Sequence, residues 1–581
     1  MSIEVSKFRG SMPWSHYSQD VPVIEGTWPE HLSGYVFIVA PYHRPRDRHL
    51  FAGEGLIIKW ELQPQEGKIK FHSQKLQTWD SFWRFIRSIL FSRAFFPARL
   101  NVFGVAEIAN TAVVNLNGRL ILTADAGRYW EVDPSTLETM TPIGYFDEHI
   151  ISIPLSFFPM LANTAHPFVD PKSNQLITCE LKFKLRKETL FTDMSSNPYI
   201  AVWDTQESKN LNRADIQHWK LEGTELDGTP HTTIVTEELI LIPDMPFQMG
   251  VILMLGINIP PRKAYPKTQI YIVRRQDLQA DQSTVTSRLL TFDGDSYHFL
   301  CNYHHINETV CFVAIQQATI SLTAAIQPGD VRHFTGDRYG EEYYGLPWMF
   351  GFDPGVLRKV LIKDAQLVQE EVFVHPGWFN TMLYAADLRE LHTPAGYSAI
   401  YQVYAGYFPD LICRRHYLSF RDHENRVLTD QQLPSGNVPS VLAKIPLDQN
   451  WQELTEKINL EQEQNPELPR TDLGKEILDF YVCPDGYILD SIQFIPQDQG
   501  YLFTTVITPT ASEVWLFAAG CLRQGAIAKL SLGEDVNLGF TLHSEYFETI
   551  QPRTSKYNVN RVLCALRSLT KVPYEYLFKQ P

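Results

Sequence analysis

The sequence lacks the features that would place the protein across a membrane, outside the cell or on nucleic acid. It contains no run of about 18 uncharged apolar residues, so no membrane-spanning helix is predicted. The N-terminal segment MSIEVSK has no apolar core of the signal-peptide type. Positive charge is also scarce, because the net charge is -15 at pH 7, whereas phosphate binding requires a dominant basic surface. We therefore expect no nucleic-acid partner.

Cysteine is sparse as well. The seven cysteines are spread from Cys179 to Cys564 and form no Cys-x-x-Cys motif. Their number is odd, and several lie inside apolar runs, which favours reduced, buried thiols over a disulfide framework. Together with the missing signal peptide, this predicts a cytoplasmic protein, either soluble or peripheral on a membrane.

Short apolar runs are abundant throughout the 581 residues, and Gly, Pro, Asn and Asp punctuate them. Few long helical patterns separate these runs, which is typical of an all-β sandwich, barrel or propeller. No strict internal repeat occurs, but a propeller with divergent blades would still bring distant strands to one axis. We find no linker and predict one domain over residues 1–581. Representative runs are residues 35–39, 120–123, 269–273, 501–506 and 513–517.

Four histidines stand beside such runs in segments suited to holding one metal ion: His166, His231, His304 and His543. His166 precedes Pro167, which restricts its backbone to extended forms and can aim the ring rigidly. His304 and His305 are adjacent, so on a strand only one of them could face a central metal. A buried histidine is more often a hydrogen-bonded structural residue than a ligand, and the chain has 18. Local patterns alone leave both readings open.

Three further segments differ from the β-rich pattern. Within residues 81–100, Phe82, Phe85, Ile86 and Ile89 recur at helical spacing among arginines, which fits either a membrane-interface helix or a helix packed over the end of the β-domain. Residues 245–261 are strongly apolar and read as core or as a loop around a hydrophobic entrance. The basic C-terminal extension, residues 548–581, is expected to pack against the main domain, with membrane or partner contact as the alternative.

Several phrases occur in an order that resembles the carotenoid cleavage oxygenase family. This family includes carotenoid, apocarotenoid and lignostilbene dioxygenases and a retinoid isomerohydrolase. The resemblance extends from about residue 22 to about residue 547. It rests on GTWPEHLSGY (26–35), HLFAGEG (49–55), ANTAVV (109–114), DPSTLET (133–139) and the four histidine segments.

The resemblance implies a seven-bladed β-propeller with a cap of helices and loops over its top face. It implies Fe(II) as the cofactor, held by His166, His231, His304 and His543. The family's outer carboxylates, which orient the ligating rings, map onto Asp125 for His231 and Asp490 for His543. For the third, the phrase at 373–376 offers no acid, and Glu370 or Glu371 is the nearest candidate.

The implied function is insertion of O₂ across a C=C bond of a carotenoid, apocarotenoid or related polyene or stilbene, giving two carbonyl products. The expected partners are a hydrophobic polyene and O₂, with Phe82, Phe85, Ile86 and Ile89 at a membrane-facing substrate entrance. No acid–base pair is required, which agrees with the lack of a nucleophile motif. Two alternatives remain: a retinoid-type isomerase or hydrolase on the same iron site, and a non-catalytic carotenoid-binding propeller.

Overall fold

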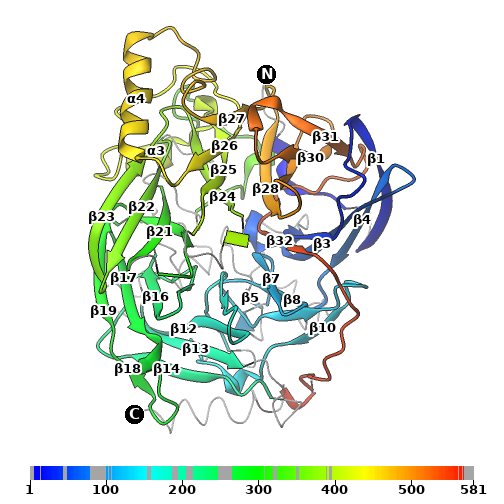
Figure 1. The fold of residues 1–581 in the computed structure, drawn as a ribbon, viewed down its shortest axis with the longest axis vertical. Coiled ribbons are helices and arrows are strands. Elements are labelled where there is room, and N and C mark those ends of the chain that lie inside the picture. Colours follow the sequence, from blue (N-terminus) through cyan, green and yellow to red (C-terminus); the bar gives the residue numbers. More distant parts are fainter. Residues whose placement is uncertain are drawn as a thin grey trace.

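A computed structural model of the protein describes residues 5–12, 15–42, 49–78, 100–101, 104–105, 107–152, 159–185, 194–204, 213–245, 265–305, 308–317, 324–347, 353–387, 389–390, 396–560, 562–564 and 567. Antiparallel sheets dominate these residues, and they follow one another in chain order around a common centre (Figure 1). The prediction of an all-β propeller is confirmed.

Five separate sheets contain four or five strands each. The first has β7 (Ala112–Leu116), β8 (Arg119–Thr123), β9 (Trp130–Val132) and β10 (Thr139–Pro142). The second has β11 (Phe168–Val169), β12 (Gln175–Leu185), β13 (Met194–Asp204), β14 (Gln217–Leu221) and β18 (Thr284–Val285). The third has β15 (Ile234–Val235), β16 (Leu239–Asp244), β17 (Lys267–Arg274) and β19 (Arg288–Asp293). The fourth has β20 (Ser296–Cys301), β21 (Val310–Gln316), β22 (Val356–Lys363) and β23 (Gln366–Phe373). The fifth has β24 (Phe379–Ala385), β25 (Ala399–Gly406), β26 (Val441–Pro446) and β27 (Asp479–Val482).

The remaining long strands form one nine-stranded sheet. Its strands are β28 (Ile488–Ile495), β29 (Tyr501–Ile507), β30 (Ser512–Ala518), β31 (Ala526–Ser531), β1 (His16–Gly26), β4 (Lys68–Lys75), β3 (Glu54–Gln65), β2 (Tyr35–Tyr42) and β32 (Ser544–Phe547). Strand β1 is shared, because its residues 16–22 pair with β4 while Val23, Glu25 and Gly26 pair with β31. The expected seven blades are therefore not seven separate sheets. A two-stranded ribbon of β5 (Leu100–Asn101) and β6 (Gly104–Val105) stands apart.

Burial along a strand depends on how many of its faces are covered. End strands of neighbouring sheets lie side by side, β7 with β11 and β32, β15 with β20, and β24 with β28. Packed on both faces, β28 is buried throughout, as its near-continuous apolar run suggests. In contrast, β4 alternates buried and partly exposed residues with the two-residue period of a half-buried strand.

The C-terminal strand closes the ring. β32 pairs with β2 from Tyr35–Phe547 to Ile38–Ser544, so the end of the sheet-forming chain joins its beginning. Phe547 is 1% exposed and meets the ring of Phe37 edge-on, with centroids 4.9 Å apart. Burying a phenyl group contributes about 1.5–3 kcal/mol, which helps to hold the closure. This pairing also fixes the position of His543, directly before β32.

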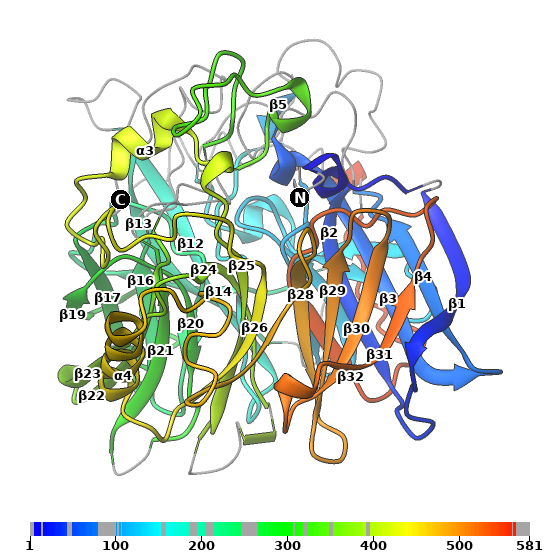
Figure 2. The same ribbon diagram turned by 90° about the horizontal axis from the view of Figure 1, so that it is seen from above.

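Helices are few among the described residues. α3 (Arg414–Phe420) lies on the same side of the sheets as β5 (Figure 2). α4 (Trp451–Gln464) packs against the outer strand β23, where Thr455 Oγ1 donates to the Val372 carbonyl at 3.1 Å. The short 3₁₀ helices are η1 (Val5–Arg9), η2 (Leu50–Ala52), η3 (Phe146–Glu148), η4 (Arg275–Asp277), η5 (Glu341–Tyr343), η7 (Pro409–Leu411) and η8 (Leu522–Gln524). Because α4 covers a side of the ring, the described helices do not confirm the expected cap over one face.

Other predictions concern segments that are only partly described. Phe82, Phe85, Ile86 and Ile89 lie outside the described residues, as does most of the apolar run 245–261. The described part of the C-terminal extension packs as predicted, since Tyr557, Val559 and Cys564 are buried with residues of β7, β8 and β9. No helix in the described ranges combines the length and apolarity needed to cross a bilayer.

Candidate metal centre

Four histidine side chains from four different sheets meet at the centre of the ring. His166 lies two residues before β11, His231 three before β15, His298 on β20 and His543 one before β32. Each offers one ring nitrogen, and these four atoms all lie within 4.8 Å of one another. The ring centroids of His166 and His543 are 4.2 Å apart, and those of His231 and His298 4.9 Å. Such convergence requires a closed arrangement of strands, because the residues are far apart in the sequence.

Backbone hydrogen bonds hold two of these segments in register. The His166 amide donates to the His231 carbonyl at 3.0 Å, and the Thr233 amide donates to the His166 carbonyl at 3.0 Å. Hydroxyl groups hold the residues directly before His166. The Tyr129 hydroxyl donates to the Thr164 carbonyl at 2.6 Å and bonds Thr178 Oγ1 at 2.7 Å. Thr123 Oγ1 donates to the Ala165 carbonyl at 2.5 Å. These buried hydroxyls leave the His166 backbone little freedom, which preorganises its ring.

The four rings form a set of neutral donors. Burial and the neighbouring imidazoles lower the pKa of His166 and His298 well below the ordinary value, and that of His543 to about 3. Within the described part of the chain, Nε2 of His166 is buried without a hydrogen-bond partner. A buried polar atom without a partner is costly, whereas a neutral imidazole nitrogen is a good metal ligand. The residues therefore fit a metal ion.

One carboxylate orients a ring of this set. Asp125 follows β8, and its Oδ1 lies 2.6 Å from Nδ1 of His231. This contact favours the tautomer in which Nδ1–H donates to the carboxylate and Nε2 is left as the free donor atom. The sequence prediction that Asp125 serves His231 agrees with this geometry.

Comparison with known proteins decides the family. A family model described as retinal pigment epithelial membrane protein matches residues 12–340, which is more than half of the 581 residues. The chain belongs to the carotenoid cleavage oxygenase family. No curated protein matches it.

Solved structures show the same fold at low identity. The cobalt-substituted apocarotenoid oxygenase of Synechocystis matches with a TM-score of 0.61 and 17% identity, over 94% of this chain and 98% of that one. A chimera of that oxygenase (ACO) and RPE65 matches with a TM-score of 0.58 and 16% identity, again over 94% and 98%. These likenesses establish the propeller fold of the family.

His304, which the family resemblance led us to expect as a ligand, lies away from the cluster, and His298 occupies the fourth place. β20 ends at Cys301, so His304 lies beyond the strand, with Nδ1 3.0 Å from Glu237 Oε2. His305 bonds Thr236 Oγ1 through Nε2 at 3.0 Å. The assignment was therefore shifted by six residues, from 298 to 304. No local signal sets His298 apart in the sequence, because it stands within the strand-like apolar run of β20.

Asp490 supports the histidine segment of β32 but lies against a different residue than expected. Its Oδ2 accepts the backbone amide of Thr541 at 2.5 Å and the Thr541 hydroxyl at 2.7 Å. Among the described residues, its buried Oδ1 has no hydrogen-bond partner. Burial raises the pKa of Asp490 to about 8. Its contacts therefore hold the backbone two residues before His543 and include none to the His543 ring.

Neither proposed third acid reaches the centre, so that prediction is wrong. Glu370 and Glu371 lie on β23, which β22 and β21 separate from β20. Glu370 pairs with Arg358 at 3.2 Å. Glu371 accepts Lys359 Nζ at 2.9 Å and the Trp451 amide at 2.9 Å, and it thereby ties α4 to the sheet. In the described ranges, no hydrogen bond to a ring nitrogen of His298 is found.

Proposed function

We propose that the protein is a non-haem Fe(II) dioxygenase that cleaves a C=C bond of a carotenoid, apocarotenoid or related polyene or stilbene with O₂ to give two carbonyl products. The observation that carries the proposal is the convergence of four neutral imidazoles, one with a buried, unpartnered nitrogen. Four neutral donors are unlike the two-histidine, one-carboxylate iron site and unlike thiolate-rich structural zinc sites. Family membership and the apocarotenoid oxygenase relatives support the reaction class.

Each residue has a definite task in this proposal. His166, His231, His298 and His543 would hold the ion through one ring nitrogen each. Asp125 holds the Nδ1 proton of His231 and so keeps the other nitrogen of that ring available. The hydroxyls of Tyr129 and Thr123 bond the Thr164 and Ala165 carbonyls and so fix the backbone directly before His166. Bound iron would supply the activation of dioxygen, and no protein acid–base pair is needed.

The finer architecture follows from the shared strand. We propose that the nine-stranded sheet is two blades, β28 to β31 and β32 with β2 to β4, joined along their outer edges by β1. Together with the five separate sheets this makes seven blades. Figure 1 is consistent with this division, because β28 and β32 both lie near the middle of the view while β1 lies at its outer edge.

The reaction is tested by anaerobic loading with Fe(II), followed by product analysis under ¹⁸O₂. The panel would contain carotenoids, apocarotenals and stilbenes. We expect one iron per chain and, with at least one substrate, a pair of carbonyl products that carries ¹⁸O. Conversion of a retinyl ester added to the same panel, with no ¹⁸O from O₂ in its product, would favour a retinoid-type isomerase or hydrolase. Stoichiometric iron with no product from any substrate would contradict the dioxygenase.

A second candidate is a carotenoid-binding propeller that holds a metal without oxygenase activity. It is favoured by one observation: of the three expected acids, only Asp125 contacts a ring of the cluster in the described structure. Under this alternative the same panel would give tight binding of a polyene, seen as a shift of its visible absorption, without turnover.

We also propose that the segment with Phe82, Phe85, Ile86 and Ile89 contacts a membrane, on the strength of its amphipathic sequence. In a liposome flotation assay the wild type should float, and replacing Phe85, Ile86 and Ile89 with Ser should lower the bound fraction about tenfold or more, since each apolar side chain contributes about 1.5–3 kcal/mol when fully buried. The matched control is Leu289→Ser, which removes an apolar side chain that is 53% exposed on β19. Equal flotation of wild type and triple variant would refute this contact.

A further inference from the structure

The loop that carries Asp125 is held from several sides. It joins β8 to β9 and comprises residues 124–129, here called the Asp125 loop. Asn163 donates its backbone amide to the Asp125 carbonyl at 3.1 Å and its side-chain amide to the Gly127 carbonyl at 2.9 Å. Gly127 has φ +93°, and a side chain there would press on Glu107. The loop therefore has one tightly constrained path past Glu107.

Arg128, three residues after Asp125, anchors this loop in the interior. It is 1% exposed, and its Nε and Nη2 donate to the two oxygens of Glu107 at 2.7 and 3.0 Å. Its backbone amide donates to the same carboxylate at 3.2 Å. Its Nη1 donates to the Gly144 carbonyl at 3.0 Å and to Cys564 Sγ at 3.3 Å. The guanidinium carbon also lies 4.0 Å from the ring centre of Phe146, so an aromatic ring packs against this buried charge.

The partners of Arg128 connect it to the C-terminal extension. We call the described residues 548–560 and 562–564 the C-terminal strap. The Tyr557 hydroxyl accepts the Gly144 amide at 2.6 Å, so the strap fixes the residue whose carbonyl receives Arg128. Cys564 is fully buried and supplies the last acceptor.

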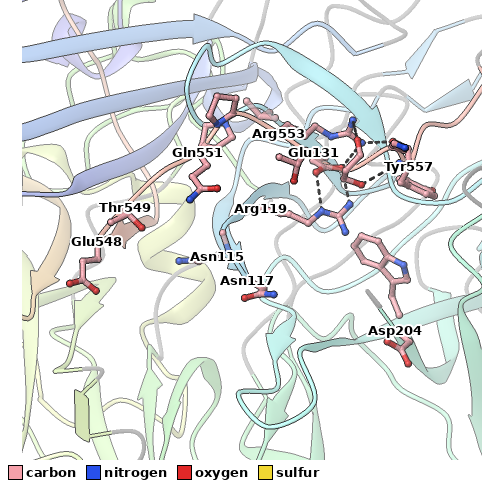
Figure 3. A pocket seen from close by; sticks show the side chains of 18 of the residues that line it. Asn115, Asn117, Arg119, Glu131, Asp204, Glu548, Thr549, Gln551, Arg553 and Tyr557 are labelled. Atoms are coloured by element: carbon pink, nitrogen blue, oxygen red, sulfur yellow. Dashed lines mark hydrogen bonds and ion pairs between the residues drawn. The ribbon is translucent and has the colours of Figure 1, made fainter. Parts of the chain in front are cut away.

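A second set of strap contacts lies further out on the same sheet. Arg553 donates one hydrogen bond to the Glu131 carboxylate at 3.0 Å. Arg119 donates two to the same carboxylate, at 2.8 and 2.9 Å (Figure 3). Both arginines border a cavity of about 820 Å³ between the strap and the β7–β8 hairpin. Arg119 thus makes the same kind of two-pronged ion pair with a buried glutamate as Arg128, but it does not touch the Asp125 loop.

We propose that Arg128 is a positioning residue that couples the C-terminal strap to Asp125 and so orients His231 for metal binding. The inference deepens the proposed function and rests on it. A planar guanidinium can serve Glu107, Gly144 and Cys564 at once, whereas a lysine ammonium lacks the fork geometry. Loss of these contacts would free the loop, and the carboxylate 2.6 Å from His231 would lose its fixed position.

The test is cobalt(II) titration of the full-length, metal-free protein, followed by visible absorption. Asp125→Asn sets the scale, because removing an outer partner of a ligating histidine typically costs 10–100-fold in metal affinity. We expect Arg128→Lys to weaken cobalt binding about tenfold and to change the ligand-field spectrum. Arg119→Lys, the matched control, should stay within about twofold of the wild type. The double variant Asp125→Asn/Arg128→Lys should bind no more weakly than Asp125→Asn alone, since both changes act through one contact.

Three results would overturn the proposal: unchanged cobalt affinity in Arg128→Lys, an equal loss in Arg119→Lys, or additive losses in the double variant. If Arg128→Lys does not fold, Cys564→Ala removes a single acceptor of Arg128. Cys564→Ala should weaken cobalt binding by about threefold. This is less than the 10–100-fold typical of losing an outer partner of a ligating histidine, because the other contacts of Arg128 remain. In that case, an unchanged cobalt affinity in Cys564→Ala would overturn the proposal. Failure of the metal site itself is seen separately, as a wild type that binds no cobalt at the four histidines.

Discussion

Replacing His298 with Ala should abolish stoichiometric metal binding, while His304→Ala should leave it intact. His298 supplies one of four nitrogen atoms within 4.8 Å of one another, and no other described donor stands in its place. Loss of a direct ligand should cost more than the 10–100-fold typical of an outer partner, so we expect a fall in affinity of more than about 100-fold. Metal analysis after dialysis and cobalt(II) titration measure this, and substrate cleavage should be lost in parallel.

His304→Ala is the matched control because the two histidines lie only six residues apart. The His304 ring pairs with Glu237 at 3.0 Å and is partly exposed. Its removal leaves the four-histidine cluster untouched, so metal content and activity should stay near the wild-type level. The opposite pattern, with metal lost in His304→Ala and retained in His298→Ala, would contradict the assignment of the centre.

The family resemblance predicted three of the four rings, although the local setting of each histidine left a structural role open. His166 and His231 stand in short polar segments just before strands, and His543 precedes the strand that closes the ring. His298 has no such mark, since it sits inside β20 between Tyr297 and Phe299 and looks like a core residue. Whether a strand residue faces the centre depends on where the strand begins and on its pleat, which a motif does not encode.

The position of the outer carboxylates could also be predicted only in part. The family resemblance placed Asp125 beside His231, and its Oδ1 lies 2.6 Å from Nδ1 of that ring. Glu370 and Glu371 were chosen for being near a family phrase, yet they belong to an outer strand paired with Arg358 and Lys359. An acid's distance along the chain from a motif says little about which strand of a blade carries it.

The all-β class was predictable from strand-like runs, whereas the joining of sheets was not. β1 begins near the N-terminus and pairs with both β4 (Lys68–Lys75) and β31 (Ala526–Ser531), which are more than 400 residues apart in the sequence. The anchoring of the C-terminal strap by buried groups such as Arg128 and Cys564 was likewise invisible, because a lone arginine or cysteine carries no sign of its partner.

A second large effect is expected on folding stability, from the buried carboxylate of Glu180. Glu180 on β12 is 3% exposed and has two histidine partners, with Oε1 2.7 Å from His149 Nδ1 and Oε2 3.0 Å from His218 Nε2. Its Oε2 also accepts the Ile150 amide at 2.7 Å. Nε2 of His149 lies 2.9 Å from the Ile143 carbonyl, so both nitrogens of that ring face acceptors and the charged imidazolium is favoured. This is a buried ion pair whose separation should be strongly destabilising.

The pKa shifts define the pH window of this pair. Burial alone would raise the pKa of Glu180, but His149 and His218 outweigh it and hold the pKa well below its usual range. That contribution is present above the unfolded value of about 4.3 and is lost as the pH falls toward the folded pKa. Burial opposes the charge on His149, yet Glu180 raises the pKa of His149 above its ordinary value. This second contribution is full below about pH 6.5 and is lost as the pH rises through the folded pKa.

Glu180→Gln should therefore lower the free energy of unfolding by about 3 kcal/mol between about pH 4.3 and 6.5, the cost of breaking a buried pair by removing one partner. The amide keeps the volume of the side chain but removes the charge that holds His149 protonated, and the buried ring must then give up its proton or remain unpaired. Urea unfolding at pH 5.5 and pH 9 measures the effect, and the difference from the wild type should shrink at pH 9. The control Glu225→Gln, which breaks the exposed pair with Lys184, should cost less than about 1 kcal/mol at either pH. An equal loss for both variants, or one that does not vary with pH, would show that the charge of Glu180 is not what stabilises this sheet.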